Sequence, residues 1–127
     1  MSETVAGIAV FDATTGPELP IVEGGGRAYA VVWPGVGASL RSLHRISLEP
    51  GSRTSALVHP SDAVYYVLAG GGAACDLSVG TEEALIEGSM THIDAGTRYE
   101  IVAGPAGMEI VGGPAPADPA LYAGLQG

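Results

Sequence analysis

The sequence predicts an all-β fold, and three features of its composition indicate it. Its 127 residues include 20 Gly and 9 Pro, the residue types that tight turns require. Hydrophobic residues make up 46% of the chain but Phe and Trp occur once each, so the core is expected to consist of Val, Ile, Leu and Ala. The Gly and Pro clusters recur at intervals that fit turns between short strands. A chain of this length forms one domain.

Glycine and proline divide the chain into an N-terminal arm (1–26), a barrel (27–115) and a C-terminal tail (116–127). Three consecutive glycines end the arm, and a second glycine run, Gly70 to Gly72, is expected to be a turn between strands. The predicted strands are 27–33, 40–48, 54–58, 63–69, 73–79, 83–87, 89–93, 98–102 and 108–111.

Alternation and capping residues support two of these elements in particular. Apolar and polar residues alternate over 40–48, which puts His44, Ile46 and Leu48 on one face, expected to be the core side. Residues 118–125 are expected to form a short helix, with Asp118 as its N-cap and Pro119 in its first turn.

Charge limits the classes of partner. Five basic residues against 14 acidic ones give a formal net charge of -9, which repels nucleic-acid phosphates and anionic membrane surfaces. The N-terminus has no basic leader, and its apolar stretch is too short to span a bilayer. We expect a cytoplasmic protein whose partner is a small organic molecule, without nucleic acid or membrane.

One stretch carries half of a known metal-binding motif. Gly51 opens it, Leu57 and His59 follow at the spacing of a His-x-His pair, Ala63 stands where a Glu is expected, and Gly70 closes it. This spacing resembles the first motif of the cupin superfamily. The glycine frame is intact, but only one of the three expected ligands is present.

The second cupin motif is matched in the same partial way. Gly88 opens it, Asp94 replaces its Pro, Gly96 is kept, Tyr99 stands at the His position and Ala103 at the Asn position. The two motifs together span roughly residues 40–112. The resemblance implies a cupin-like double-stranded β-helix, a jelly-roll barrel with an N-terminal arm and a short C-terminal helix or tail.

In cupins, three His and one Glu hold a first-row divalent metal such as Fe, Mn, Ni or Zn inside the barrel. The resemblance therefore implies either such a metal or, because most ligands are replaced here, none. If His44, His59 and His92 converge, they form a three-imidazole metal site, completed by Asp94, Asp62 or a water.

A second interpretation assigns acid–base chemistry to the same pocket. Tyr99, at the motif His position, and Tyr65, expected on the inner face, would act with His59 as catalytic groups. His44 and Arg53 are the candidate substrate-binding residues, because a guanidinium near a pocket mouth binds carboxylates.

Three functions follow from these readings. The first is an isomerase, lyase or cyclase that uses acid–base chemistry, with or without a metal. The alternative is a non-catalytic protein that binds or senses a small ligand after loss of the metal site. The third is a structural partner, and a homodimer is expected, with apolar Ile8, Val10 and Phe11 of the arm contacting the second subunit.

Overall fold

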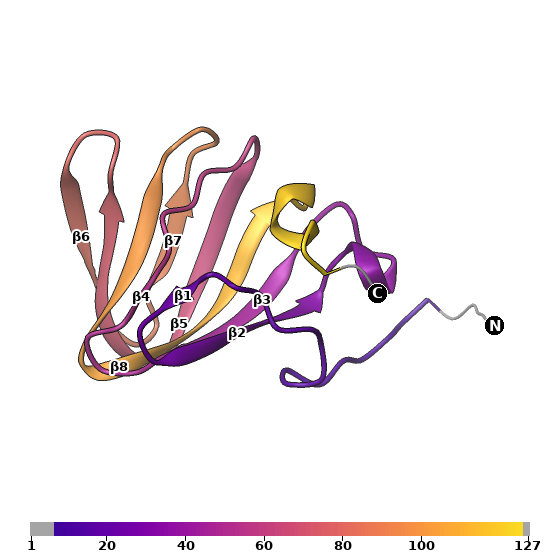
Figure 1. Ribbon diagram of the computed structural model, residues 1–127, viewed down its shortest axis with the longest axis horizontal. Coiled ribbons are helices and arrows are strands. Elements are labelled where there is room, and N and C mark those ends of the chain that lie inside the picture. Colours follow the sequence, from indigo (N-terminus) through magenta and orange to yellow (C-terminus); the bar gives the residue numbers. More distant parts are fainter. Residues whose placement is uncertain (1–6, 126–127) are drawn as a thin grey trace.

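The computed structural model describes residues 7–125, and almost all of the regular secondary structure in this range is β-strand. The strands are β1 (Val22–Glu23), β2 (Gly26–Val32), β3 (Leu43–Leu48), β4 (Arg53–Thr54), β5 (Asp62–Asp76), β6 (Thr81–Leu85), β7 (Met90–Ile93) and β8 (Tyr99–Ala115). Two short 3-10 turns complete the described chain, η1 (Pro34–Val36) and η2 (Pro119–Tyr122). Every strand pairing is antiparallel, and the strands form a nearly closed barrel (Figure 1). The predicted all-β jelly-roll barrel is confirmed.

Two long strands hold the barrel together. The first half of β5 pairs with the second half of β8, and its second half pairs with the first half of β8. In one wall of the barrel, the first half of β5 also pairs with β7, and the second half of β8 also pairs with β3, which in turn pairs with β2. In the other wall, the second half of β5 also pairs with β6, and the first half of β8 also pairs with β4, which in turn pairs with β1. Each long strand therefore belongs to both walls of the barrel.

The glycine run 70–72 is not a turn, which corrects the prediction from the sequence. Strands expected at 63–69 and 73–79 are one strand, β5, and those expected at 98–102 and 108–111 are both parts of β8. A Cβ on Gly70 would lie 2.1 Å from the Gly107 carbonyl oxygen, and one on Gly72 would lie 1.9 Å from that of Val102. These glycines let the two bent strands approach each other closely without ending either of them.

Other boundaries differ by less. The third strand begins at Leu43 instead of residue 40, and β4 ends at Thr54, beyond which Leu57 forms an isolated bridge to Tyr99. The C-terminal helix expected over 118–125 is the single 3-10 turn η2, although Asp118 does cap it by accepting a hydrogen bond from the Ala120 N–H at 3.0 Å. This turn lies beside the end of β8 (Figure 1).

The core fills the space between the two walls with alternate residues of the strands. Ile46, Val67, Ile101 and Ile110 are fully buried there. The N-terminal residues Leu19 and Ile21 also pack into this cluster, next to β1. The start of the described arm extends away from the barrel (Figure 1), whereas Thr14 lines the same surface hollow as Arg27 and Tyr29 of β2. Within residues 7–125, no helix has both the length and the apolar character to cross a membrane.

Candidate functional site

The fold brings the four metal-shell positions of the resembled motif together. Leu57 and Tyr99 exchange two backbone hydrogen bonds, each of 2.8 Å, so the two motifs lie side by side in the barrel wall at this point. Leu57, His59, Ala63 and Tyr99 are all buried. Two of these four side chains, Leu57 and Ala63, are apolar and offer no donor atom to a ligand.

A buried chain of hydrogen bonds takes the place that the resemblance assigns to a metal. His59 Nδ1 lies 2.7 Å from Asp118 Oδ2, and its Nε2 lies 2.8 Å from the Tyr99 hydroxyl. The Tyr99 hydroxyl in turn lies 2.7 Å from that of Tyr65. We call Asp118, His59, Tyr99 and Tyr65 the buried relay, because their polar atoms are linked in one line through the barrel interior.

Donor and acceptor chemistry gives the buried relay a direction. An ionised carboxylate only accepts, so Asp118 accepts a hydrogen bond from His59 Nδ1–H, and in the neutral imidazole Nε2 is then an acceptor. The Tyr99 hydroxyl then donates to Nε2 and accepts from the Tyr65 hydroxyl. Every hydrogen bond runs towards Asp118, and the Tyr65 and Tyr99 oxygens keep lone pairs that can accept another proton.

Both phenols are held neutral. Burial raises the pKa of Tyr65 to about 12, although the hydrogen bond with Tyr99 opposes part of that rise. Burial also raises the pKa of Tyr99, and the neighbouring Tyr65 adds to the effect. Forming a phenolate in this interior therefore costs free energy, so each phenol gives up its proton most easily when its oxygen accepts another proton at the same time.

His44 forms a second contact with the C-terminal turn. It is fully buried, and its Nε2 lies 2.6 Å from the Tyr122 hydroxyl. Its Nδ1 has no hydrogen-bond partner within the described part of the chain. Burial, with a smaller effect from His59, lowers the pKa of His44 to about 4, so this imidazole is neutral at pH 7. Asp118 and Tyr122 thus tie η2 to the two interior histidines.

The third histidine lies apart from the other two. His92 is exposed on β7, and its Nε2 lies 2.9 Å from Asp94 Oδ1. Asp62, His92 and Asp94 form the one cluster of three ligand side chains, among residues 7–125, whose donor atoms lie within 4.8 Å of one another. This exposed cluster is a potential metal-binding triad on the outside of the barrel. The three histidines do not converge on one metal site.

Arg53 lies outside the buried site as well. Its guanidinium is half-exposed and lies 3.2 Å from the Glu100 carboxylate. It is not among the residues that line the described hollows. In this conformation its charge is paired with Glu100 and is not directed to the barrel interior.

The buried relay does not fit a divalent metal. Both ring nitrogens of His59 already have hydrogen-bond partners, and a metal would displace Asp118 or Tyr99 from them. Neutral phenols are poor ligands, and Leu57 and Ala63 supply none. No step of a reaction is therefore assigned to a metal inside the barrel.

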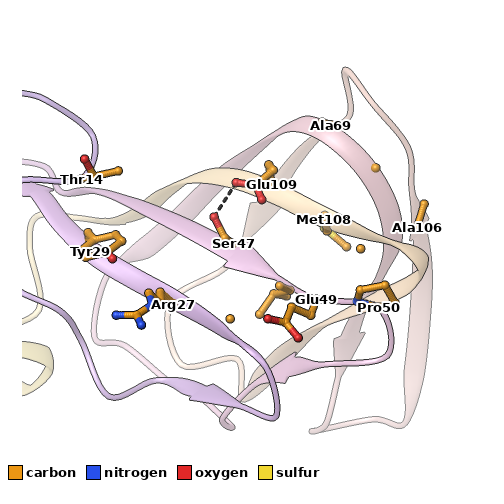
Figure 2. Close-up of a pocket in the computed structure, with 14 residues that line it drawn as sticks. Thr14, Arg27, Tyr29, Ser47, Glu49, Pro50, Ala69, Ala106, Met108 and Glu109 are labelled. Carbon is orange, nitrogen blue, oxygen red and sulfur yellow. Dashed lines mark hydrogen bonds between the residues drawn. The ribbon is translucent and has the colours of Figure 1, made fainter.

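Two hollows adjoin the barrel. One of about 690 Å³ lies on its outer surface, lined by residues such as Arg27, Tyr29, Ser47, Glu49 and Glu109, and contains none of the predicted site residues (Figure 2). The other, of about 240 Å³, lies between β6 and β7 and includes Tyr99 in its lining. Of these two hollows, the smaller one has a residue of the buried relay, Tyr99, in its lining.

Asp118 and Tyr122 were not among the site residues predicted from the sequence. Asp118 lies 59 positions after His59, and the only local signal at that position is the helix-capping pattern, Asp followed by Pro. That pattern predicts the capping hydrogen bond that Oδ1 makes, and it says nothing of the contact between Oδ2 and His59.

Solved structures share this fold. A cupin-like protein of Thermotoga maritima superposes with a TM-score of 0.70 at 18% identity, over 85% of this chain and 81% of that one. A predicted oxalate decarboxylase from the same organism gives 0.68 at 19% identity, over 84% and 98%. Ectoine synthase from P. lautus gives 0.60 at 17% identity, over 72% and 64%. No protein-family model matches the sequence, and no curated protein matches it. The likeness shows that this chain has the cupin fold.

Proposed function

We propose that this protein is an acid–base enzyme, an isomerase or lyase, that acts on a small polar molecule without a metal in the barrel. The observation that carries the proposal is the buried relay, whose hydrogen bonds link two phenols through His59 to Asp118 in one line. Structural neighbours described as a predicted oxalate decarboxylase and as ectoine synthase have the same fold, which supports the general class.

The buried relay can move a proton without forming a phenolate. A phenol oxygen accepts a proton from the substrate while the phenol's own proton passes to His59 Nε2. His59 then carries two ring protons, and the Asp118 carboxylate at 2.7 Å stabilises the resulting cation. Return of the proton to a different substrate atom completes an isomerisation. Its delivery to a departing group, which leaves with the bonding electrons, completes an elimination.

The energetics argue against a purely space-filling role. Burying polar and charged groups costs free energy unless each is paired, and apolar side chains would fill the same volume at lower cost. His59 is 3% exposed and Asp118 is 5% exposed, so both are removed from water and held by the contacts described above. An arrangement of this kind is typical of sites where proton affinities are set for a task.

A non-catalytic ligand-binding protein is the second candidate. The observation that favours it is access, because Tyr65 and Tyr99 are only 1% and 2% exposed. A ligand would then occupy the smaller hollow against Tyr99 without exchanging a proton with it.

Deuterium exchange separates the two functions without knowledge of the product. A panel of small hydroxy, carbonyl and amino compounds is incubated with the protein in D2O, and loss of C–H signals is followed by proton NMR. We expect the wild type to exchange a C–H of at least one compound, and Tyr99→Phe to slow that exchange by about 100-fold or more. Tyr66→Phe is the matched control, since Tyr66 is the exposed neighbour of Tyr65 on β5.

Two outcomes would count against the enzyme. If a compound binds but none of its C–H groups exchanges, the ligand-binding function replaces it. If exchange occurs equally fast in Tyr99→Phe, the protein is an enzyme but the buried relay is not its proton path.

A further inference from the structure

The polar groups of the buried relay are shielded from solvent. Tyr65, Tyr99 and His59 are all buried, and neither of the two hollows is lined by Tyr65 or His59. A general acid or base has to come within about 3 Å of the substrate atom with which it exchanges a proton. The proposed chemistry therefore requires that one element of the protein moves aside.

The C-terminal segment is fixed to the barrel at its first two residues. Strands β5 and β8 pair with each other over most of their length, whereas residues 116–125 belong to no strand. The Ser61 hydroxyl donates to the Pro116 carbonyl oxygen at 2.7 Å, and the Ala117 N–H donates to the Ser39 carbonyl oxygen at 3.0 Å. The rest of the segment can move about this point while the strands of the barrel stay paired.

The rest of the segment covers the two interior histidines. Asp118 contacts His59 at 2.7 Å and Tyr122 contacts His44 at 2.6 Å, so each of these two side-chain contacts ends on an imidazole. The Tyr122 ring also packs against Trp33, with the ring centroids 5.1 Å apart. This turn, η2, lies beside the end of β8 (Figure 1). Movement of η2 would uncover both histidines.

The apolar contacts of the segment are weaker than those of the strands. Ala117, Leu121 and Leu125 pack against the core but stay partly exposed. The fully buried core residues, such as Ile46 and Ile110, lie on strands. Moving the segment therefore exposes much less apolar surface than unfolding the barrel does.

Tyr122 also lies near the phenol end of the buried relay. Tyr65 of β5 and His44 of β3 both pair with Gly112 of β8, so their side chains lie in one row on the inner face. Tyr122 contacts His44 in this row, and the pKa of Tyr65 is raised by burial and also by the neighbouring Tyr122 hydroxyl. The segment thus covers the relay from Asp118 at one end to the vicinity of Tyr65 at the other.

We infer that residues 116–125 form a lid, which opens about Pro116 and Ala117 to give access to the barrel interior and completes the buried relay when it closes over the substrate. The second part of this statement rests on the proposed function, and the opening itself does not. An open lid takes Asp118 away from His59, so no carboxylate from the lid stabilises a protonated His59. Proton transfer is therefore confined to the closed lid, where bulk water is excluded.

Opening is tested by thiol labelling of the folded protein in a Cys75→Ser background, which removes the one native cysteine. Ser42→Cys places the reporter under the lid, because buried Ser42 donates to the Pro114 carbonyl oxygen at 2.7 Å and its hydroxyl opposes the rise that burial causes in the pKa of Tyr122. Ala103→Cys is the matched control, since Ala103 is also buried but lies in the other wall of the barrel. With iodoacetamide and mass spectrometry, we expect the thiol at position 42 to react about tenfold faster than that at position 103.

The contact between the lid and His44 is tested in the same assay. Tyr122→Phe keeps the ring against Trp33 and removes the hydroxyl that contacts His44, so it should speed labelling at position 42 by about fivefold and leave position 103 within about twofold. Tyr66→Phe, an exposed tyrosine on β5, should change neither rate. A compound whose C–H is exchanged should slow labelling at position 42, because it binds under the closed lid.

Equal labelling at positions 42 and 103, or a rate at position 42 that Tyr122→Phe leaves unchanged, would overturn the lid. Fast labelling at position 42 with no C–H exchange of any compound supports the lid and rejects the enzyme. C–H exchange with equal labelling at the two positions keeps the enzyme and rejects the lid. An exchanged compound that speeds labelling at position 42 rejects closure over the substrate.

Discussion

Replacing Asp118 with alanine is expected to lower the free energy of unfolding by about 3 kcal/mol. Its Oδ1 caps η2 through the Ala120 N–H, and loss of such a cap costs about 1 kcal/mol. Its Oδ2 accepts from buried His59, and a hydrogen bond to a charged group contributes about 1.5–3 kcal/mol. Asp118→Asn keeps one acceptor oxygen and puts an NH2 donor in place of the other, so it can hold only one of the two contacts and should cost about 2 kcal/mol.

Urea denaturation followed by tryptophan fluorescence measures this loss. Trp33 is the one tryptophan of the chain, and its ring centroid lies 5.1 Å from that of Tyr122 in η2, so its emission reports on the C-terminal turn. With a slope of about 1.5–2 kcal/mol per molar urea, Asp118→Ala should lower the midpoint by about 1.5–2 M. Circular dichroism at the same urea concentrations shows whether the barrel unfolds with the turn. An unchanged midpoint and unchanged emission in Asp118→Ala would refute the role given to this carboxylate.

Three further predictions address the interior histidines and the bend. The pKa of His44 is lowered from 6.5 to about 4, so the stability that its neutral form contributes is complete above pH 6.5 and is lost as the pH falls towards 4. The loss should amount to about 3 kcal/mol. His44→Gln should flatten this dependence of the free energy of unfolding on pH, and His92→Gln should retain it. Gly70→Ala should cost about 3 kcal/mol or more because its Cβ meets a backbone oxygen, whereas Gly51→Ala, with positive φ but open space, should cost about 1 kcal/mol in the same urea assay. Plasma mass spectrometry should find the same metal content in wild type and His59→Ala, and a stoichiometric metal lost in that variant would contradict a metal-free barrel.

Local periodicity was sufficient for the part of the site that lies on strands. Alternation predicts His44 and Tyr65 on inner faces, and both are buried. The motif frame also brings His59 and Tyr99 to neighbouring positions, now joined by a hydrogen bond of 2.8 Å. These relations depend on spacing within one strand or within a glycine-framed motif, which a single sequence contains. Their catalytic roles stay predictions, as does the homodimer.

Long-range contacts could not be predicted in the same way. A glycine run has the same local signature in a turn and in a bent strand, and only the opposite strand distinguishes them, here through the carbonyl of Gly107 facing Gly70. The position of Asp118 against His59 likewise depends on how the tail crosses the barrel. His92 could have faced either way, because its strand is short and its neighbours do not alternate clearly. The structure places it outside.

The direction of the buried relay is tested most directly by the tautomer of His59. The chain contains three histidines, so 15N-labelled imidazole signals can be assigned with single variants. At pH 7 we predict a proton on His59 Nδ1 and none on Nε2, with a shift of the Nε2 signal in Tyr99→Phe. A His59 with its proton on Nε2, or an Nε2 signal that does not respond to Tyr99→Phe, would contradict a proton path from the phenols to Asp118.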